Sequence, residues 1–95
     1  MQEPSTRDTA IATARDAMRR LVVDVVDHPE PGVVFKDITP LLGDPDGLRA
    51  AVEAVAWAGR DEAGRTTVTK VVGTEARGFI LAAPAAIALG VGFVP

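Results

Sequence analysis

The feature that most limits the fold of this chain is a long stretch without polar side chains. Residues 79–95 carry no charged or polar side chain over about 17 residues, close to the length of a membrane span. The stretch is interrupted by Pro84, Gly90, Gly92 and Pro95. A buried helix followed by a buried parallel strand gives the same continuous apolar pattern. The interruptions favour a buried helix and strand over the alternative, which is a membrane-associated or purely structural fragment.

The residues before this stretch complete a strand, helix, strand pattern. Residues 67–72 are rich in β-branched side chains and predict a strand, residues 73–78 predict a turn, residues 79–89 a helix and residues 91–94 a second strand. This order implies a right-handed crossover and a parallel sheet, so the fold class is α/β. Ligands of such sheets bind at the carboxyl ends of the strands, which makes the turn at residues 73–78 the expected site.

Two amphipathic helices are predicted in the first part of the chain. One begins near Thr6 to Asp8 and ends in the proline-containing run 27–32. Its apolar stripe has a spacing of three and four residues and consists of Ile11, Ala14, Met18, Leu21, Val22, Val25 and Val26. The other begins at Asp44-Pro45-Asp46, where the sequence has helix-capping chemistry, and its stripe is Leu48, Ala51, Val52, Val55 and Ala56. Residues 33–38 between them predict a short extended segment that carries Phe35.

Composition excludes several classes of function. The 95 residues suffice for one small domain or part of a larger one. The net charge of −3 comes from interspersed acids and bases, without the basic block that a nucleic-acid partner requires. The chain has no cysteine, which excludes disulfides and thiolate metal sites. Its polar start lacks the apolar core of a signal peptide, and we expect a cytoplasmic protein without a membrane partner.

The turn at residues 73–78 has the chemistry of an anion site. Its amides precede a helix, so they point at a ligand with the help of the helix dipole and of the Arg77 guanidinium. The two glycines have P-loop spacing, but Phe79-Ile80 replaces the Lys-Ser/Thr pair of that motif, which disfavours a P-loop NTPase. A plain strand-to-helix connection is the alternative interpretation.

The other candidate residues each have a structural alternative. Phe35 offers a flat face to a planar ring, or it belongs to the core. Lys36 and Asp37 are a possible catalytic pair, although adjacent charges usually form local contacts. His28 has no second metal ligand nearby in sequence, and Glu75 has no carboxylate partner for acid–base work.

Two segments together identify a family resemblance. PGVVFKDI, from Pro31 to Ile38, and GTEARGF, from Gly73 to Phe79, resemble the adenine phosphoribosyltransferases. The resemblance runs from about Asp27 to Pro95. It implies the N-terminal part of a type I phosphoribosyltransferase sheet with flanking helices. The implied activity is transfer of the phosphoribosyl group from phosphoribosyl pyrophosphate (PRPP) to adenine, giving AMP and pyrophosphate in purine salvage, with Mg²⁺ accompanying PRPP.

The resemblance also implies roles for particular residues. Phe35 would stack on adenine, while the backbones of Val34 and Lys36 would bind its polar edge. The pyrophosphate loop would be Glu75, Ala76, Arg77 and Gly78, with a cis peptide between Glu75 and Ala76. No residue of this chain is implied as a catalytic acid or base or as a metal ligand.

The chain departs from the family pattern at its end. It stops at Phe93-Val94-Pro95, before the catalytic loop and the segment that would hold the ribose phosphate, so we expect a truncated product that is inactive alone. We divide the single partial domain into a helical region (1–27), a base-facing loop (28–43) and a strand-turn-helix-strand unit (67–95). The whole enzyme would be a homodimer. A noncatalytic purine-responsive regulator of the same fold is the alternative function, but it would lack the base site at Phe35.

Overall fold

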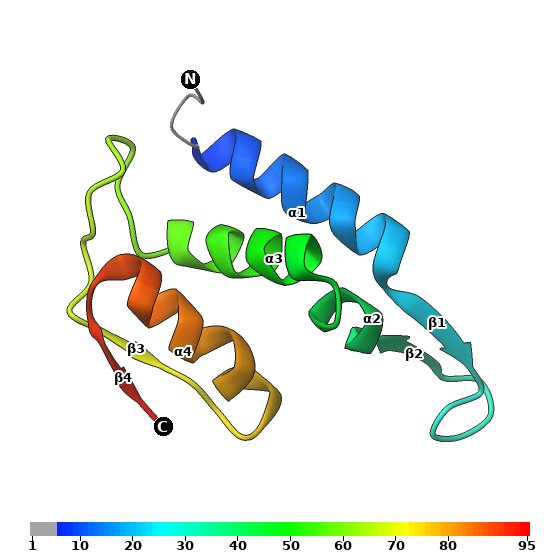
Figure 1. The fold of residues 1–95 in the computed structure, drawn as a ribbon. Coiled ribbons are helices and arrows are strands. Elements are labelled where there is room, and N and C mark those ends of the chain that lie inside the picture. The colour runs from blue at the N-terminus through cyan, green and yellow to red at the C-terminus, as the bar shows by residue number, and fades with distance from the viewer. Residues whose placement is uncertain (1–5) are drawn as a thin grey trace.

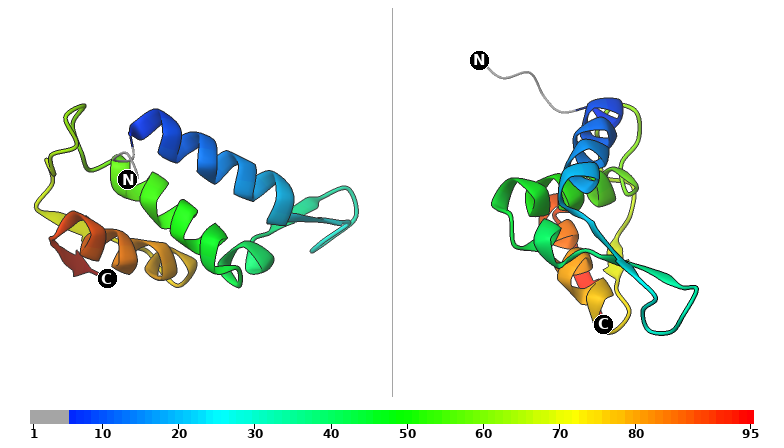
Figure 2. Two further views of the ribbon diagram at one scale, coloured as in Figure 1. Left: turned by 45° about the horizontal axis from the view of Figure 1, so that its top comes forward. Right: turned by 90° about the vertical axis from the view of Figure 1, so that its right-hand side faces the viewer.

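The structure is a computed structural model that describes residues 6–95. Its elements in chain order are α1 (Arg7–Leu21), β1 (Val23–Val26), β2 (Val34–Asp37), α2 (Thr39–Leu42), α3 (Pro45–Trp57), β3 (Lys70–Val72), α4 (Arg77–Leu89) and β4 (Gly92–Val94). Helix α1 packs along α3, α3 packs along α4, and β3 and β4 lie on α4 (Figure 1). The β1–β2 hairpin projects from the end of α1 as an arm, which is clearest in Figure 2.

Helix α1 begins at Arg7, within the predicted range Thr6 to Asp8. The Thr6 side chain accepts a hydrogen bond from the Thr9 amide at 3.3 Å, and the Thr9 hydroxyl oxygen accepts one from the Thr6 amide at 2.9 Å. This reciprocal capping box satisfies amides that the first helical turn leaves unpaired. The buried residues of the helix are Ala10, Ala14 and Ala17. Small side chains therefore let α1 and α3 approach closely.

The predicted extension of this first helix to residue 26 is wrong. The helix ends at Leu21, and Val23–Val26 forms β1, which pairs antiparallel with β2 in the register Val23↔Asp37 to Val26↔Val34. β-branched valines favour the extended backbone, and a partner strand lies within reach across a short loop. Val26, which the predicted stripe would have buried, is 68% exposed.

Helix α3 confirms the predicted cap and shifts the predicted stripe. Asp44 is the N-cap, its carboxylate accepts the Gly47 amide at 2.7 Å, and Pro45 follows as the first helical residue. The stripe is rotated, because its buried residues are Gly47, Ala50, Ala56 and Trp57, whereas Val55 is 42% exposed. The small residues face α1 and α2: a Cβ at Gly47 would lie 2.9 Å from Leu21 Cδ1.

The predicted strand, turn, helix, strand unit is confirmed. Strands β3 and β4 pair in parallel, with Val71 opposite Phe93, and α4 connects them. Gly90 ends α4 in the left-handed conformation (φ 72°) that favours glycine. β3 is shorter than the predicted segment 67–72, because the Thr67 amide bonds to the Gly59 carbonyl at 2.8 Å. Across residues 6–95, no helix is both long enough and apolar enough to cross a membrane.

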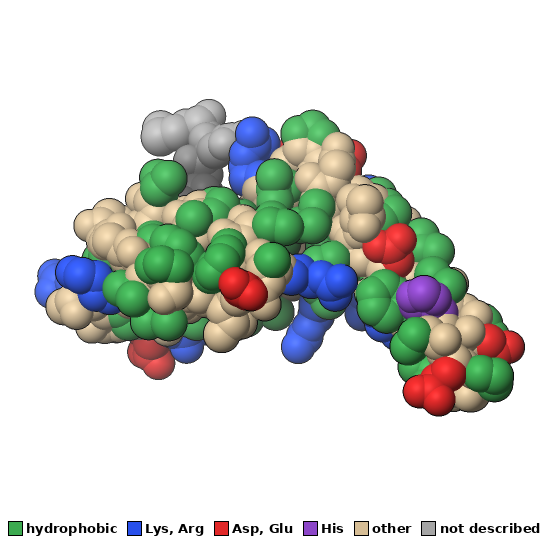
Figure 3. Space-filling model, turned by 90° about the horizontal axis from the view of Figure 1, so that it is seen from below, with side chains coloured by type: hydrophobic (Ala, Val, Ile, Leu, Met, Phe, Trp, Pro, Cys, Tyr) green, Lys and Arg blue, Asp and Glu red, His purple; other side chains and the backbone are tan. Residues whose placement is uncertain are grey.

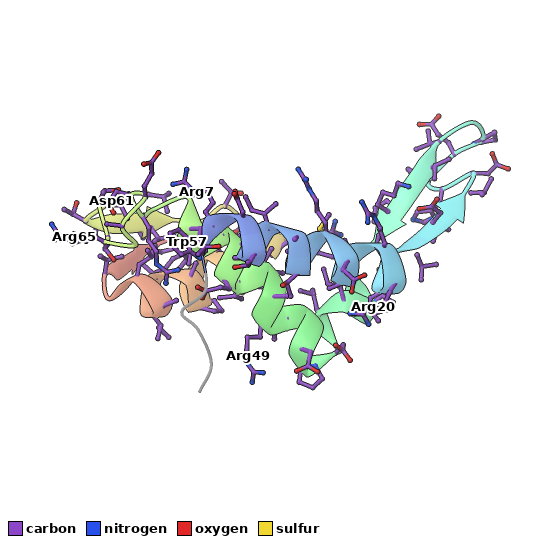
Figure 4. All side chains as sticks on the ribbon, turned by 90° about the horizontal axis from the view of Figure 1, so that it is seen from above. Arg7, Arg20, Arg49, Trp57, Asp61 and Arg65 are labelled. Atoms are coloured by element: carbon purple, nitrogen blue, oxygen red, sulfur yellow. The ribbon has the colours of Figure 1, made fainter. Side chains whose placement is uncertain are left out.

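An arginine after α3 connects three helices. Arg60 Nη1 lies 2.7 Å from Glu53 Oε1, the guanidinium lies 5.1 Å from the Trp57 ring centroid, and Nη2 reaches the Ala88 carbonyl of α4 at 3.4 Å. The Arg60 carbonyl accepts a hydrogen bond from Arg7 of α1 at 2.9 Å. Figure 4 shows Arg7 and Trp57 at this end of the molecule, away from the hairpin.

We expect Arg60→Ala to lower the free energy of unfolding by about 1 to 3 kcal/mol, because Glu53 loses a partly buried partner and Trp57 loses a cation contact. The matched control is Arg20→Ala. Its pair with Asp16 at 3.0 Å is 59% and 66% exposed, so the expected loss is below about 0.5 kcal/mol. Urea unfolding of both variants gives the comparison, and equal losses would contradict the prediction.

Candidate functional site

Alternate side chains of strand β2 point toward β1 and toward the start of α4. Lys36 turns toward β1, where its Nζ lies 2.6 Å from Asp24 Oδ1. Phe35, one position earlier, contacts Arg77 at the start of α4, and the positive charge of Arg77 also acts on Asp37, one position later. Successive side chains of a strand point to opposite faces, so the alternation follows from the strand itself. The Lys36 side chain is therefore held in a local ion pair.

Phe35 is held on two sides. The ring of His28 contacts it edge-on, with centroids 5.2 Å apart and planes at 77°. The Arg77 guanidinium lies over the ring, with its Cζ 5.6 Å from the centroid. The loop that carries His28 is closed by a hydrogen bond from the His28 amide to the Val33 carbonyl at 3.0 Å and one from the Gly32 amide to Asp27 Oδ1 at 2.9 Å. These contacts fix the aromatic ring beside the α4 turn.

The turn at residues 73–78 leaves a helix start accessible. Gly73 is buried, whereas the four residues that follow it, Thr74 to Arg77, are exposed. Ala76 is the N-cap of α4 and makes no side-chain hydrogen bond to the helix amides, and the first turn contains no acid. The expected cis peptide between Glu75 and Ala76 is present. The amides and the dipole of α4 together with Arg77 form an environment that attracts an anion.

A cleft of about 510 Å³ opens next to this turn. It is lined by Ile38, Thr39, Leu42, Glu75, Ala76, Arg77 and Ile80, so both the α2 region and the α4 turn contribute to it. Figure 3 shows the molecule from below, with Lys and Arg side chains where the helical body meets the hairpin arm. Arg77 and the helix start favour a negatively charged group in this cleft, and the lining residues include one acid, Glu75.

Asp37 forms a local turn with Thr39 at the edge of the cleft. The Thr39 amide donates a hydrogen bond to Asp37 Oδ1 at 2.9 Å. This hydrogen bond, a second one from the Thr39 side chain and, less strongly, the positive charge of Arg77 lower the pKa of the carboxyl below its ordinary value of 3.8. Asp37 is therefore ionised at neutral pH, and it fixes the start of α2.

The lowered pKa of Asp37 gives a pH-dependent stability difference. Because the folded pKa lies below the unfolded value, the ionised carboxyl stabilises the fold fully above about pH 4. This stabilisation is lost as the pH falls from there through the lower folded pKa. We expect Asp37→Asn to be less stable than wild type by a constant amount from pH 7 to pH 5, and the difference to vanish at low pH. An NMR titration midpoint for Asp37 at or above 3.8 would contradict this.

The structure brings together the two predicted parts of the site through Phe35 and Arg77. Glu75 and Ala76 line the cleft, and Gly78 follows them in the first turn of α4. Val34, which is 51% exposed, and Lys36 lie on either side of Phe35 in β2. Within the region 28–43, β2 lies where an extended segment was predicted, and the short helix α2 follows it.

Sequence reasoning missed two contacts around this site. His28 was considered only as a metal ligand, whereas its ring packs on Phe35. Thr39 was not identified, although an acid two residues before a threonine is a signal for a local side-chain to backbone turn. The contact between His28 and Phe35 had no such signal, because the register of the hairpin decides it.

The fold and the site together indicate a class of protein. A parallel strand-turn-helix-strand unit with an exposed arginine in its turn, beside an aromatic on a separate hairpin, agrees with the α/β fold that the resemblance to type I phosphoribosyltransferases implies, and solved adenine phosphoribosyltransferases share this fold. The chain is similar to adenine phosphoribosyltransferases, and the resemblance inferred from its two motifs is confirmed by known relatives. A comparison with models of known protein families gives no match.

The alignments with the relatives include most of this chain. The chain spans half or less of the length of each relative described here. An adenine phosphoribosyltransferase of Nocardioides sp. is 60% identical over 75 residues, which are 79% of this chain and 40% of that protein. The crystal structure of the enzyme from Rhodothermus marinus has a TM-score of 0.67 at 49% identity and covers 88% of this chain, which matches 46% of it. The Saccharomyces cerevisiae enzyme, crystallised with adenine and an imino-altritol bisphosphate, has a TM-score of 0.77 at 27% identity, over 90% of this chain and 50% of that one.

Proposed function

We propose that the protein carrying this chain transfers the phosphoribosyl group of PRPP to adenine, giving AMP and pyrophosphate in purine salvage. The observation that carries the proposal is the contact of Arg77 with Phe35, with the guanidinium 5.6 Å from the ring centroid. A base platform and an anion-binding turn, far apart in the sequence, thus lie side by side. The similarity to named adenine phosphoribosyltransferases supports the same conclusion.

The proposed chemistry requires control of charge and orientation. The bond between C1 of the ribose and the pyrophosphate oxygen breaks, the bond between adenine N9 and C1 forms, and the N9 proton is released. Negative charge grows on the leaving pyrophosphate as its bond breaks, and preorganised donors that face this charge lower the barrier. Arg77 and the amides of residues 75–78 would hold the leaving group, while Phe35 and the backbones of Val34 and Lys36 would align adenine for attack.

Mg²⁺ belongs to the proposal as a companion of PRPP. Among residues 6–95, no three acidic or histidine side chains gather into a cation site. No residue in that range is assigned to Mg²⁺, and no step is assigned to a resident metal. The metal would be carried by the oxygens of PRPP itself.

The test is formation of AMP from adenine and PRPP by the complete gene product that carries this sequence. We expect AMP and pyrophosphate to appear in equal amounts and to require both substrates. The control replaces adenine with a purine whose polar edge differs, such as hypoxanthine, which we expect to react much more slowly. A complete gene product that forms no AMP from these substrates would contradict the proposal and favour a noncatalytic protein of the same fold.

The cytoplasmic location and the homodimer form part of the same proposal. Large apolar side chains on several elements are exposed, among them Ile87 at 82%, Val72 at 69% and Met18 at 48%. Surfaces of this kind are typical of contacts with other protein segments. Analytical ultracentrifugation of the complete gene product tests the dimer, and a monomer at micromolar concentration would contradict it.

A further inference from the structure

The arginine assigned to the pyrophosphate lies, in this structure, over the aromatic ring assigned to the base. Arg77 Cζ is 5.6 Å from the centroid of Phe35, within the range of a cation–π contact. A purine that stacks on this face of the ring would need the same space. The Arg77 side chain therefore cannot contact the Phe35 ring and bind the pyrophosphate at the same time.

The Arg77 side chain is free to exchange between these partners. It is exposed, and within the described range 6–95 no salt bridge holds its guanidinium. Asp37 attracts it electrostatically, without a direct ion pair. Its backbone, in contrast, is fixed as the first residue of α4, next to the exposed amides of the turn. A rotation of the side chain alone thus takes the guanidinium from the ring to a ligand at the helix start.

The relative strength of the two contacts decides where Arg77 goes. A guanidinium binds a phosphate through two parallel, charge-assisted hydrogen bonds, with further help from the α4 dipole. An exposed cation–π contact is weaker than such a pair. A diphosphate at the turn should therefore draw Arg77 away from Phe35 and uncover the ring.

We propose that Arg77 couples the two halves of the site: it covers Phe35 in the free protein and leaves the ring to the purine when a diphosphate binds at the start of α4. This role is additional to holding the pyrophosphate, and it rests on the proposed function. The contact of Arg77 with Phe35 lowers the affinity for the purine by a certain factor in the free protein, and the diphosphate restores the affinity by the same factor. By linkage, the purine raises the affinity for the diphosphate equally. An exposed cation–π contact corresponds to a factor of about two to five.

The experiment measures adenine binding to the complete gene product by calorimetry, with and without saturating inorganic pyrophosphate. For wild type we expect pyrophosphate to lower the Kd of adenine about two- to fivefold. Arg77→Ala and Arg77→Gln should bind adenine more tightly than wild type by about the same factor when pyrophosphate is absent, and pyrophosphate should then add nothing. A variant that gains affinity cannot be explained by damage to the fold.

The matched control is Arg49→Ala. Arg49 points away from the body of α3 (Figure 4), with 78% of its side chain exposed and a single pair to Asp46 at 3.4 Å, so we expect wild-type behaviour. Weaker adenine binding by Arg77→Ala, or a wild-type Kd that pyrophosphate does not change, would overturn the coupling while leaving the proposed function intact. A wild-type protein that binds no adenine would overturn the proposed function, and the coupling with it.

Discussion

Phe35→Ala is expected to weaken adenine binding by about 1 to 3 kcal/mol, the size of a lost stacking contact between a base and an aromatic ring. The corresponding increase in Kd is roughly 5- to 150-fold. The structure supports a large effect because Phe35 is a half-buried ring on a strand, fixed edge-on by His28 at 5.2 Å. A rigid platform loses little conformational entropy when a ligand stacks on it. Calorimetric titration of adenine into the complete gene product measures the change.

Two further substitutions separate stacking from packing at this position. Phe35→Tyr keeps the flat face, so adenine affinity should remain within about twofold of wild type if stacking decides it. Phe35→Leu keeps apolar bulk without an aromatic face and should resemble Phe35→Ala in adenine affinity, while remaining close to wild type in stability. If Phe35→Leu bound adenine as well as wild type, Phe35 would be a packing residue of the hairpin and the base site would lie elsewhere.

The elements that sequence reasoning predicted correctly are those with local causes. Asp44 and Pro45 start α3 through contacts within one helical turn, and Gly90 ends α4 through its own backbone conformation. The apolar run from Phe79 could be divided into a helix and a strand because Gly90 and Gly92 interrupt it. These features need no knowledge of the rest of the fold.

The elements that it missed depend on distant partners. Val23–Val26 has an apolar pattern that also fits a helix, and it becomes a strand because residues 34–37 pair with it. The stripe of α3 rotates because α1 approaches so closely at Gly47 that only small residues fit. The periodicity of one segment does not reveal the pairing of β1 with β2 or the close approach of α1 to α3. Tertiary contacts therefore decide both the strand and the rotated stripe.

The candidate site shows the same division. The turn at residues 73–78 was identified from its own glycines and arginine, together with its place between a strand and a helix. Its proximity to Phe35 could come only from the resemblance or from the structure, because nothing in either segment specifies how the hairpin is placed relative to α4. The Arg77 contact over the ring was not predicted by either route.

A second large effect is expected at Gly73, where the fold and the site meet. A Cβ added to Gly73 would lie 2.8 Å from Ala82 Cβ on α4, 2.9 Å from Phe93 Cε1 on β4 and 3.1 Å from the Gly78 carbonyl oxygen. Two of these distances are too short for carbon atoms in contact, and the atoms belong to the helix and strand that frame the turn. Gly73→Ala must therefore displace α4 relative to β3, because Ala82 Cβ and the Gly78 carbonyl oxygen are fixed to the α4 backbone.

We expect Gly73→Ala to lower the free energy of unfolding by about 1 to 3 kcal/mol, as overpacking of a tight contact does. The matched control is Gly92→Ala in β4, where the added Cβ meets only Lys70 Cδ at 3.5 Å and Cε at 3.7 Å, an ordinary contact with a flexible side chain. Since alanine also restricts the unfolded chain, Gly92→Ala should be neutral or more stable by up to about 1 kcal/mol. Urea unfolding of both variants against wild type measures these changes.

The displacement at Gly73 should also be visible in binding. Gly73 immediately precedes the exposed turn that carries Arg77, so a shift of α4 changes the direction of the amides that face the proposed pyrophosphate. Gly73→Ala should therefore bind inorganic pyrophosphate at least tenfold more weakly at a temperature where the variant is still folded, while Gly92→Ala binds it as wild type does. A Gly73→Ala protein with unchanged pyrophosphate affinity, despite reduced stability, would show that the close packing beneath the turn supports the fold without positioning the site.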